Sequence, residues 1–217
     1  MADYTALIDY GAGNLRSVAN ALRVAGARYD ITDDVVVTAD PDVVRHAARI
    51  VLPGVGAFRA CAEALRAVPG LVEAMTERVQ VGGAPFLGIC VGMQLLATRG
   101  IEYGTTPGLD WIGGEVRPIV PADPTIKVPH MGWNDVEPHH AAPLIEPGEA
   151  YFLHSYHFVP DAGDHIAAMT DHGGGLVAAV ARDTVLGVQF HPEKSQDVGL
   201  TVLRNFVEGI AAGNLVV

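Results

Sequence analysis

Continuous apolar runs alternate with helix-period stretches through the first hundred residues. The runs Tyr4 to Asp9, Arg49 to Leu52 and Pro85 to Ile89 are short and almost free of charge, which predicts strands buried on both faces. The stretches between and after them predict helices over Leu15 to Ala25, Asp40 to His46, Ala57 to Ala67, Leu71 to Val81 and Val91 to about Thr98. This alternation predicts a parallel sheet with helices on both faces.

From Gly104 onward, short β-type stretches separated by Gly- and Pro-rich turns replace the helical patterns. They predict strands over Ile112 to Val116, Trp133 to Val136, Ala150 to Leu153, His165 to Thr170, Leu176 to Ala181 and Val185 to Phe190. A last helix is expected from about Gln196 to Ala212. Without a repeat or linker, residues 1–217 are interpreted as one α/β domain. Its fold is a single open, mostly parallel sheet of flavodoxin type, flanked by helices and extended by antiparallel strands in the C-terminal half.

A strand-to-helix turn carries the first candidate for chemistry. The turns after Asp9, Leu52 and Ile89 should share one edge, because the carboxyl ends of parallel strands meet there. The last of these turns, Gly88-Ile89-Cys90-Val91-Gly92, has the spacing of a nucleophile elbow, with Cys where hydrolases carry Ser. A buried, inert cysteine between two unrelated glycines is the alternative. A nucleophile would need a base from elsewhere in the chain.

His191-Pro192-Glu193 is the strongest candidate for that base and its orienting carboxylate. It follows the predicted strand ending at Phe190. In an extended chain, residues two apart point the same way, so Glu193 could orient His191 while the imidazole takes the thiol proton. Other histidines fit this role less well. His139 and His140 lie in a turn rich in Pro and Glu, and His154 and His157 are either structural or line the site.

Composition narrows the class of partners. The chain has 14 Lys and Arg against 25 Asp and Glu, a net charge of −11, which argues against nucleic acid and anionic membranes as partners. Two cysteines and no signal-like start predict a reduced, cytoplasmic protein. No apolar run approaches the ~20 residues of a membrane helix.

No metal or cofactor site is predicted. Cys61 has no Cys or His partner at zinc-ligand spacing and is interpreted as a small core or boundary residue. The turn Gly11-Ala12-Gly13 resembles the start of a dinucleotide fingerprint, but Arg16 stands where its third glycine would be. An ordinary glycine turn is the favoured interpretation.

The Cys elbow and the His-Pro-Glu sequence together resemble the class I (triad) glutamine amidotransferases, over essentially the whole chain. Within that family, four further blocks resemble the glutaminase subunits of imidazole glycerol phosphate synthases from histidine biosynthesis. They are residues 9–15 (Asp-Tyr-Gly-Ala-Gly-Asn-Leu), 53–56 (Pro-Gly-Val-Gly), 129–134 (Pro-His-Met-Gly-Trp-Asn) and 151–156 (Tyr-Phe-Leu-His-Ser-Tyr). The blocks are specific when taken together, whereas Gly-x-Cys-x-Gly alone is not.

The resemblance implies a catalytic cycle on glutamine. Cys90 thiolate would attack the carboxamide, His191 would give a proton to the leaving ammonia and then activate water, and Glu193 would orient His191. Backbone N–H groups of Val55 and Val91 are the implied oxyanion hole, and the family's Val55 donor is thought to need a peptide flip that a partner promotes. The implied substrate-holding residues are Gln94 and, with weaker support, Gly56, Ser155 and Tyr156.

The resemblance also implies a partner. Ammonia would pass to a (β/α)8-barrel cyclase subunit in a heterodimer, which makes imidazole glycerol phosphate and an aminoimidazole carboxamide ribotide. Asn14, Trp133 and Asn134 are the candidates for the surface facing that partner. Core packing is the alternative for Trp133, and because Met131 and Trp133 alternate along one strand-like stretch, at most one face of that stretch is interior.

Three other functions remain open from the sequence. The glutaminase of pyridoxal phosphate synthase would carry Pro-Gly-Gly-Glu-Ser where this chain has Pro53-Gly54-Val55-Gly56. A stand-alone cysteine amidase or peptidase of the same fold would need neither Gln94 nor the block at 129–134. A non-catalytic binding module would have no use for Cys90, His191 and Glu193.

Overall fold

The computed structural model describes residues 4–28, 34–139 and 144–209. In these residues one sheet contains nine strands: β1 (Tyr4–Ile8), β2 (Asp34–Thr38), β3 (Arg49–Gly54), β4 (Phe86–Cys90), β8 (His130–Pro138), β9 (Gly148–His154), β11 (Ile166–Asp171), β12 (Gly175–Arg182) and β13 (Val185–Val188). Their order is β2-β1-β3-β4-β13-β12-β11-β8-β9. Pairing is parallel from β2 to β13 and antiparallel from β13 to β9. The predicted parallel core with added antiparallel strands is confirmed.

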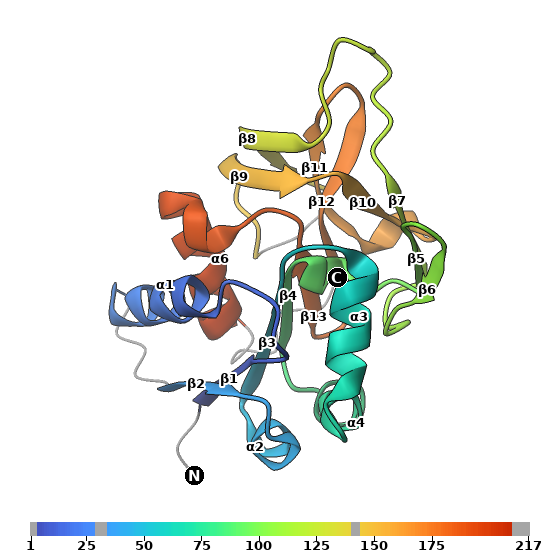
Figure 1. Ribbon diagram of the computed structural model, residues 1–217. Coiled ribbons are helices and arrows are strands. Elements are labelled where there is room, and N and C mark those ends of the chain that lie inside the picture. The colour runs from blue at the N-terminus through green and yellow to red at the C-terminus, as the bar shows by residue number, and fades with distance from the viewer. Residues whose placement is uncertain (1–3, 29–33, 140–143, 210–217) are drawn as a thin grey trace.

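Helices cover both faces of the parallel half, as the sequence pattern predicts. The α-helices are α1 (Leu15–Arg28), α2 (Pro41–His46), α3 (Phe58–Ala67), α4 (Leu71–Thr76), α5 (Val91–Gln94) and α6 (Gln196–Gly209). In Figure 1, α1 and α6 lie together on one side of the sheet, and α3 and α4 lie on the other. The last three residues of the helix expected to end at Ala212 lie outside the described residues.

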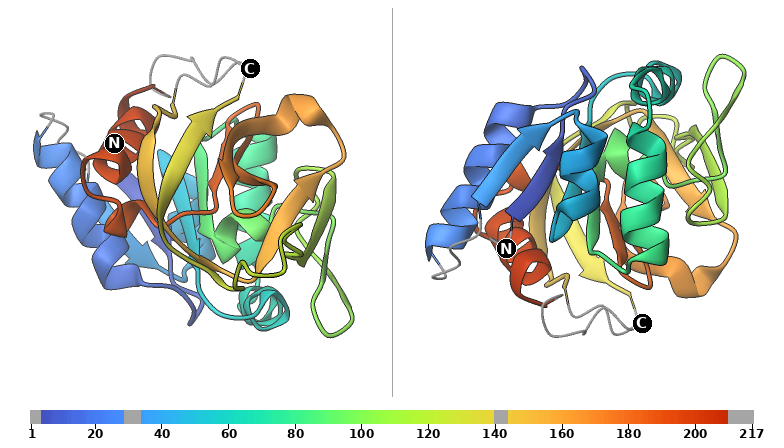
Figure 2. Two further views of the ribbon diagram at one scale, coloured as in Figure 1. Left: turned by 90° about the horizontal axis from the view of Figure 1, so that it is seen from above. Right: turned by 90° about the horizontal axis from the view of Figure 1, so that it is seen from below.

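A second, four-stranded sheet was not predicted. It contains β5 (Arg99–Ile101), β6 (Thr105–Pro107), β7 (Gly114–Pro118) and β10 (Tyr156–Pro160), in the order β10-β7-β5-β6. In the predicted topology, the later strands join the main sheet. Instead, β10 follows β9 almost directly and pairs antiparallel with β7. The two views of Figure 2 show this small sheet beside the main one, on the side away from α1.

The helix after the elbow is four residues long, where eight were expected. Its continuation is diverted because residues 108–112 capture the carbonyl groups that a longer helix would use. Leu95 C=O accepts from Leu109 N–H at 2.7 Å, and Leu96 C=O accepts from Trp111 and Ile112 N–H at 3.0 and 3.1 Å. Tertiary hydrogen bonds here override an apolar pattern that by itself favours a helix.

Other differences lie where local patterns are weak. Strand β2 was not predicted, because it is an edge strand whose valines are partly buried or exposed and show no alternation with polar residues. The helix expected to end at Val81 changes at Glu77 to a π-helical segment, Glu77–Val81. A short 3-10 turn, Gly163–His165, precedes β11. Within the described ranges, no helix is both long and apolar enough to cross a membrane.

The elbow is where backbone packing is closest. Cys90 is the last residue of β4, and Gly54 of β3 is its partner across the sheet. A Cβ atom on Gly92 would lie 1.9 Å from the carbonyl oxygen of Leu52, and one on Gly88 would lie 2.6 Å from that of Gly92. Both glycines are required because backbone, which cannot rotate away, occupies the space of a side chain.

Replacing Gly92 by Ala should therefore destabilise the fold strongly. We expect a loss of ~3 kcal/mol or more in the free energy of unfolding, because the added methyl overlaps the Leu52 carbonyl. Chemical denaturation measures it. Gly163→Ala is the matched control, because a Cβ there meets nothing within 4 Å. Equal stability of the two variants would contradict the packing argument.

Candidate active site

A pocket of about 520 Å³ opens beside the elbow. Its walls come from six separate segments: the turn after β3, the elbow and α5, the turn after β5, the residue before β8, the β9–β10 corner and the turn after β13. The lining residues are Val55, Gly56, Cys90, Val91, Gln94, Glu102, Tyr103, Pro129, Leu153, His154, Ser155, Tyr156, His191 and Lys194. Eight of the nine catalytic, oxyanion and substrate-binding residues predicted from the sequence therefore line one pocket. The ninth, Glu193, lies behind His191.

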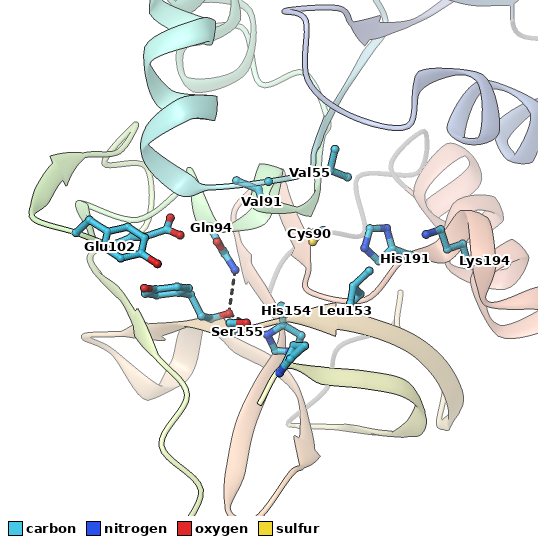
Figure 3. Close-up of a pocket in the computed structure, with 14 residues that line it drawn as sticks. Val55, Cys90, Val91, Gln94, Glu102, Leu153, His154, Ser155, His191 and Lys194 are labelled. Atoms are coloured by element: carbon cyan, nitrogen blue, oxygen red, sulfur yellow. Dashed lines mark hydrogen bonds between the residues drawn. The ribbon is translucent and has the colours of Figure 1, made fainter. Parts of the chain in front are cut away.

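Cys90 is held in a backbone conformation that side chains rarely adopt. Its φ is 54° and its ψ is −111°, outside the regions favoured by residues other than glycine. The side chain is nearly buried, with 3% of the residue exposed. Figure 3 shows its sulfur beside the His191 imidazole. Strain of this kind persists only where surrounding structure fixes it, and it is common at sites that present a nucleophile.

His191 and Glu193 form the expected pair, although not for the expected reason. His191 Nδ1 lies 2.9 Å from Glu193 Oε1, and both side chains are almost fully buried. His191 itself is extended, but the chain after it is not. Pro192–Lys194 form a 3-10 turn, so the turn, rather than strand alternation, brings the carboxylate back to the imidazole.

The electrostatics of this pair favour a protonated imidazole. Burial alone lowers the pKa of His191, but hydrogen bonds and charge from Cys90 and Glu193 outweigh burial and raise that pKa from 6.5 to about 9. An imidazolium between a thiolate and a carboxylate is the arrangement that a Cys-His nucleophile needs. It can hand a proton to a leaving group on the substrate.

The backbone of His191 is tied to strand β9. His191 N–H donates to Tyr151 C=O at 2.9 Å. The Ser195 hydroxyl donates to His191 C=O at 2.7 Å and accepts from Tyr151 N–H at 2.9 Å. Sequence reasoning missed Ser195. Its signal is weak, because a serine four residues after a histidine is common in loops.

Two buried glutamines meet beside the sulfur. Gln94 Nε2 donates to Tyr156 C=O and to Gln189 Oε1, both at 3.0 Å. Gln189 Nε2 in turn donates to Cys90 Sγ at 3.7 Å. Gln189 was not among the sequence candidates. Its signal in the sequence is its position two residues before His191, within the predicted strand Val185 to Phe190.

The proposed oxyanion residues lie on two sides of the sulfur. Val91 follows Cys90 directly, and Val55 belongs to the turn after β3 (Figure 3). The Cys61 thiol on α3 donates to Val55 C=O at 3.4 Å, and the Tyr10 hydroxyl donates to Pro53 C=O at 2.8 Å. Cys61 is 1% exposed and packs in the core, which confirms the role expected for it, and its contact with Val55 adds to that role. The oxyanion role of both valines stays a prediction.

The pocket also carries two charged groups that the sequence analysis did not single out. Glu102 and Lys194 lie at opposite ends of the row of residues in Figure 3, with Cys90 between them. Glu102 Oε2 accepts from Phe58 N–H at 2.6 Å, which fixes the carboxylate at the pocket wall. Lys194 Nζ lies 5.4 Å from the centre of the Tyr151 ring. A fixed carboxylate at one end suits the ammonium group of an amino acid.

The predicted partner residues do not share one surface. Trp133 is 46% exposed and Met131 62% exposed, so core packing of Trp133 is excluded. The adjacent Asn134 faces the other way, and its Nδ2 contacts Asp171 C=O at 2.6 Å and His130 Nε2 at 3.0 Å. Asn14 lies at the start of α1 and is partly exposed. An interface role for these residues stays a prediction.

The remaining histidines are largely structural. His154 lines the pocket, and its Nδ1 donates to Tyr156 C=O at 2.9 Å, while its Nε2 lies 3.0 Å from His130 Nδ1. Burial lowers the pKa of His130 to about 4 and that of His154 to about 3, so both are neutral. His157 is also buried, whereas His139 is exposed and His140 lies outside the described residues. In the described part of the chain, no cluster of His, Cys, Asp and Glu is arranged to hold a metal.

Comparison with known proteins agrees with this geometry. The family model for "Glutamine amidotransferase class-I" matches residues 6–210. The chain belongs to the class I glutamine amidotransferases. Among solved structures, this amidotransferase is similar to a crystal structure of a glutamine amidotransferase (TM-score 0.71, 20% identity, 94% of this chain and 97% of that one). It is also similar to the glutaminase domain of Trypanosoma brucei CTPS with bound acivicin (TM-score 0.62, 16% identity, 97% and 94% covered). At these identities the likeness shows the fold alone.

Curated relatives indicate which group within the class I glutamine amidotransferases the chain resembles. The amidotransferase is 57% identical over 207 residues to the imidazole glycerol phosphate synthase subunit HisH of Zymomonas mobilis subsp. mobilis, with 94% of each chain covered. It is 54% identical to the subunit of that name from Caulobacter vibrioides, with 94% of this chain and 97% of that protein covered. These similarities place the amidotransferase within the HisH subunits and confirm the resemblance inferred from the sequence blocks.

The raised pKa of His191 predicts how stability depends on pH. The pKa of His191 is about 9 in the folded chain and takes the ordinary value of 6.5 in the unfolded chain. Protonation of His191 therefore favours the folded form. That contribution is complete below about pH 6.5 and is lost as pH rises through about 9. The difference in unfolding free energy between the wild type and His191→Gln should therefore shrink across this interval. Denaturant titrations at a series of pH values test it, and a difference that grows with pH would contradict the assignment.

Proposed function

We propose that this protein is the glutaminase subunit of an imidazole glycerol phosphate synthase. It hydrolyses glutamine to glutamate and ammonia and delivers the ammonia to a cyclase subunit. The observation that carries the proposal is the strained Cys90 beside an imidazole that is paired with a buried carboxylate, within a pocket that has a fixed acidic group at its far end. Identity above 50% to HisH subunits supports the synthase over the pyridoxal phosphate enzyme and over a stand-alone amidase.

The first half of the reaction uses the imidazolium. Glutamine enters with its ammonium group toward Glu102 and its carboxamide toward Cys90. The sulfur attacks the carboxamide carbon, and backbone N–H groups of Val55 and Val91 stabilise the oxyanion; each donor contributes ~3 kcal/mol in comparable sites. His191 gives its proton to the nitrogen as ammonia leaves. A γ-glutamyl thioester on Cys90 remains.

The second half reverses the role of the imidazole. Neutral His191 takes a proton from water, whose oxygen attacks the thioester carbon, and the carbon–sulfur bond breaks to restore the thiolate. Glu193 stabilises the imidazolium each time it forms. Gln94, Gly56, Ser155 and Tyr156 hold the substrate. No metal or cofactor takes part in these steps.

The partner is proposed to be a (β/α)8-barrel cyclase that forms a heterodimer with this chain in the cytoplasm. An apolar surface beside the pocket supports a docking site. Met131 and Trp133 on β8 are exposed, and Leu153, opposite Met131 on β9, is 37% exposed while also lining the pocket. Residues opposite each other in an antiparallel pair face the same side. Large side chains exposed together at a pocket mouth are typical of an interface.

The role of Cys90 is tested by comparing product formation with glutamine and with ammonium salt as the source of nitrogen. In the complex, Cys90→Ala should lower glutamine-dependent product formation by ~10⁴-fold or more, because the nucleophile is removed. Turnover with added ammonium salt should stay near the wild-type rate, because the cyclase does not need Cys90. Product formation is measured with each source. If both rates fall equally, Cys90 does not serve glutamine chemistry.

The docking surface is tested by truncating its largest side chain. Trp133→Ala should weaken binding to the cyclase by ~30-fold, the effect of losing an aromatic side chain at the centre of an interface. Titration calorimetry measures it. Val81→Ala is the control, because Val81 is 84% exposed but lies at the end of the π-helical segment, away from the pocket. Equal affinities for the two variants would place the cyclase elsewhere.

A further inference from the structure

One buried group beside the sulfur, Gln189, takes no part in the proposed steps of glutamine hydrolysis. Gln189 is fully buried, with 0% of its surface exposed, and its Nε2 donates to Cys90 Sγ at 3.7 Å. Its backbone N–H donates to Ala178 C=O at 2.8 Å, which anchors the residue to strand β12. A polar side chain buried this deeply is costly unless its hydrogen bonds are made.

The direction of every hydrogen bond in this cluster follows from one carbonyl group. Tyr156 C=O can only accept, so the Gln94 atom 3.0 Å away must be the amide nitrogen. That same nitrogen lies 3.0 Å from Gln189, so the Gln189 atom facing it must be oxygen. The remaining end of the Gln189 amide, which faces the sulfur, is therefore the NH₂ group.

A second donor strengthens this assignment. His154 Nδ1 also lies against Tyr156 C=O, at 2.9 Å, and must carry a proton there. The carbonyl oxygen thus accepts from two fixed donors, and neither Gln94 nor Gln189 can turn its amide over without losing hydrogen bonds in a buried place. The N–H group that Gln189 presents to Cys90 is preorganised.

The charges around the sulfur leave a distinct role for a neutral donor. His191 faces it from the turn after β13, with Glu193 behind the imidazole. Tyr10 on the turn after β1 and Cys61 on α3 add no charge, because burial raises the pKa of both groups. Gln189 adds an amide N–H without adding a charge. Hydrogen bonds from neutral donors to an ionised acceptor are stronger than those between neutral groups.

We propose that Gln189 is a further catalytic residue, whose amide N–H stabilises the Cys90 thiolate at both ends of the reaction cycle. The inference rests on the proposed glutaminase function. When the sulfur lone pair forms the S–C bond and the C–N bond breaks, the sulfur loses its negative charge. When water adds and the C–S bond breaks, that electron pair returns to the sulfur. The N–H group therefore binds most strongly to the free thiolate, before attack and after hydrolysis.

The test measures thiolate reactivity directly. Gln189→Met keeps nearly the same shape and removes the donor, and Gln189→Asn keeps an amide but withdraws it by one methylene group. Alkylation of Cys90 by iodoacetamide is followed between pH 5 and 10 in the full chain, by mass spectrometry, because Cys61 is a second thiol. Thr170→Val is the control, since Thr170 is buried and its hydroxyl has no hydrogen-bond partner in the described structure.

In both Gln189 variants we expect alkylation at neutral pH to slow by ~10–100-fold and its pH profile to move to higher pH, as loss of a hydrogen bond to a charged group implies. The kcat for glutamine should fall by a similar factor, and Thr170→Val should change neither. Thermal unfolding identifies which variants are folded. An unmoved alkylation profile in either folded Gln189 variant would overturn the proposal.

The outcome separates this inference from the proposed function. Alkylation needs no glutamine and no cyclase, so the profile reports on Gln189 even if the wild-type complex shows no glutaminase activity. In that case the proposed function fails while the inference is still decided. If glutamine turnover depends on Cys90 but the alkylation profile of the Gln189 variants matches the wild type, the function stands and Gln189 has a packing role.

Discussion

The contact on which this site depends is one of backbone against backbone. The chain turns from β4 into α5 directly against the end of β3, so closely that Gly92 leaves no room for a side chain beside the Leu52 carbonyl. That proximity places the turn after β3, which carries Val55, across from Cys90. The same packing holds the chain directly after Cys90 against β3, next to the residue with the unusual conformation. Nucleophile and oxyanion turn are thus positioned by the same packing.

Much of this arrangement is encoded in local sequence. Buried parallel strands can be recognised in the sequence as continuous apolar runs. The spacing of the elbow glycines and the sequence His191-Pro192-Glu193 indicate a nucleophile and its base. The parallel half of the sheet, the pairing of His191 with Glu193 and the family could therefore be predicted. The exposure of Trp133 could only be left open, because a tryptophan on an alternating strand suits either face.

Features that depend on contacts between residues far apart in the sequence could not be predicted. The helix after the elbow ends early because N–H groups of residues 108–112 donate to the carbonyl groups that follow it. The sequence of residues 91–98 does not indicate these hydrogen bonds. The 3-10 turn replaces the expected extended chain at Pro192. Gln189 and Glu102 acquire a role only when strands far apart in sequence bring them to Cys90 and to the pocket wall. Single glutamines and glutamates are too common in sequences to signal this.

The backbone hydrogen bond between His191 and Tyr151 has a mechanical consequence. Tyr151 lies opposite Trp133 on the β8–β9 pair, and the two rings form a T-shaped contact with a centroid distance of 6.1 Å. The backbone that carries the imidazole is thus tied to the same pair of strands that presents the exposed apolar side chains. Because this bond joins the base to the strand pair that carries Met131 and Trp133, we expect a partner seated on those side chains to act on the imidazole as well.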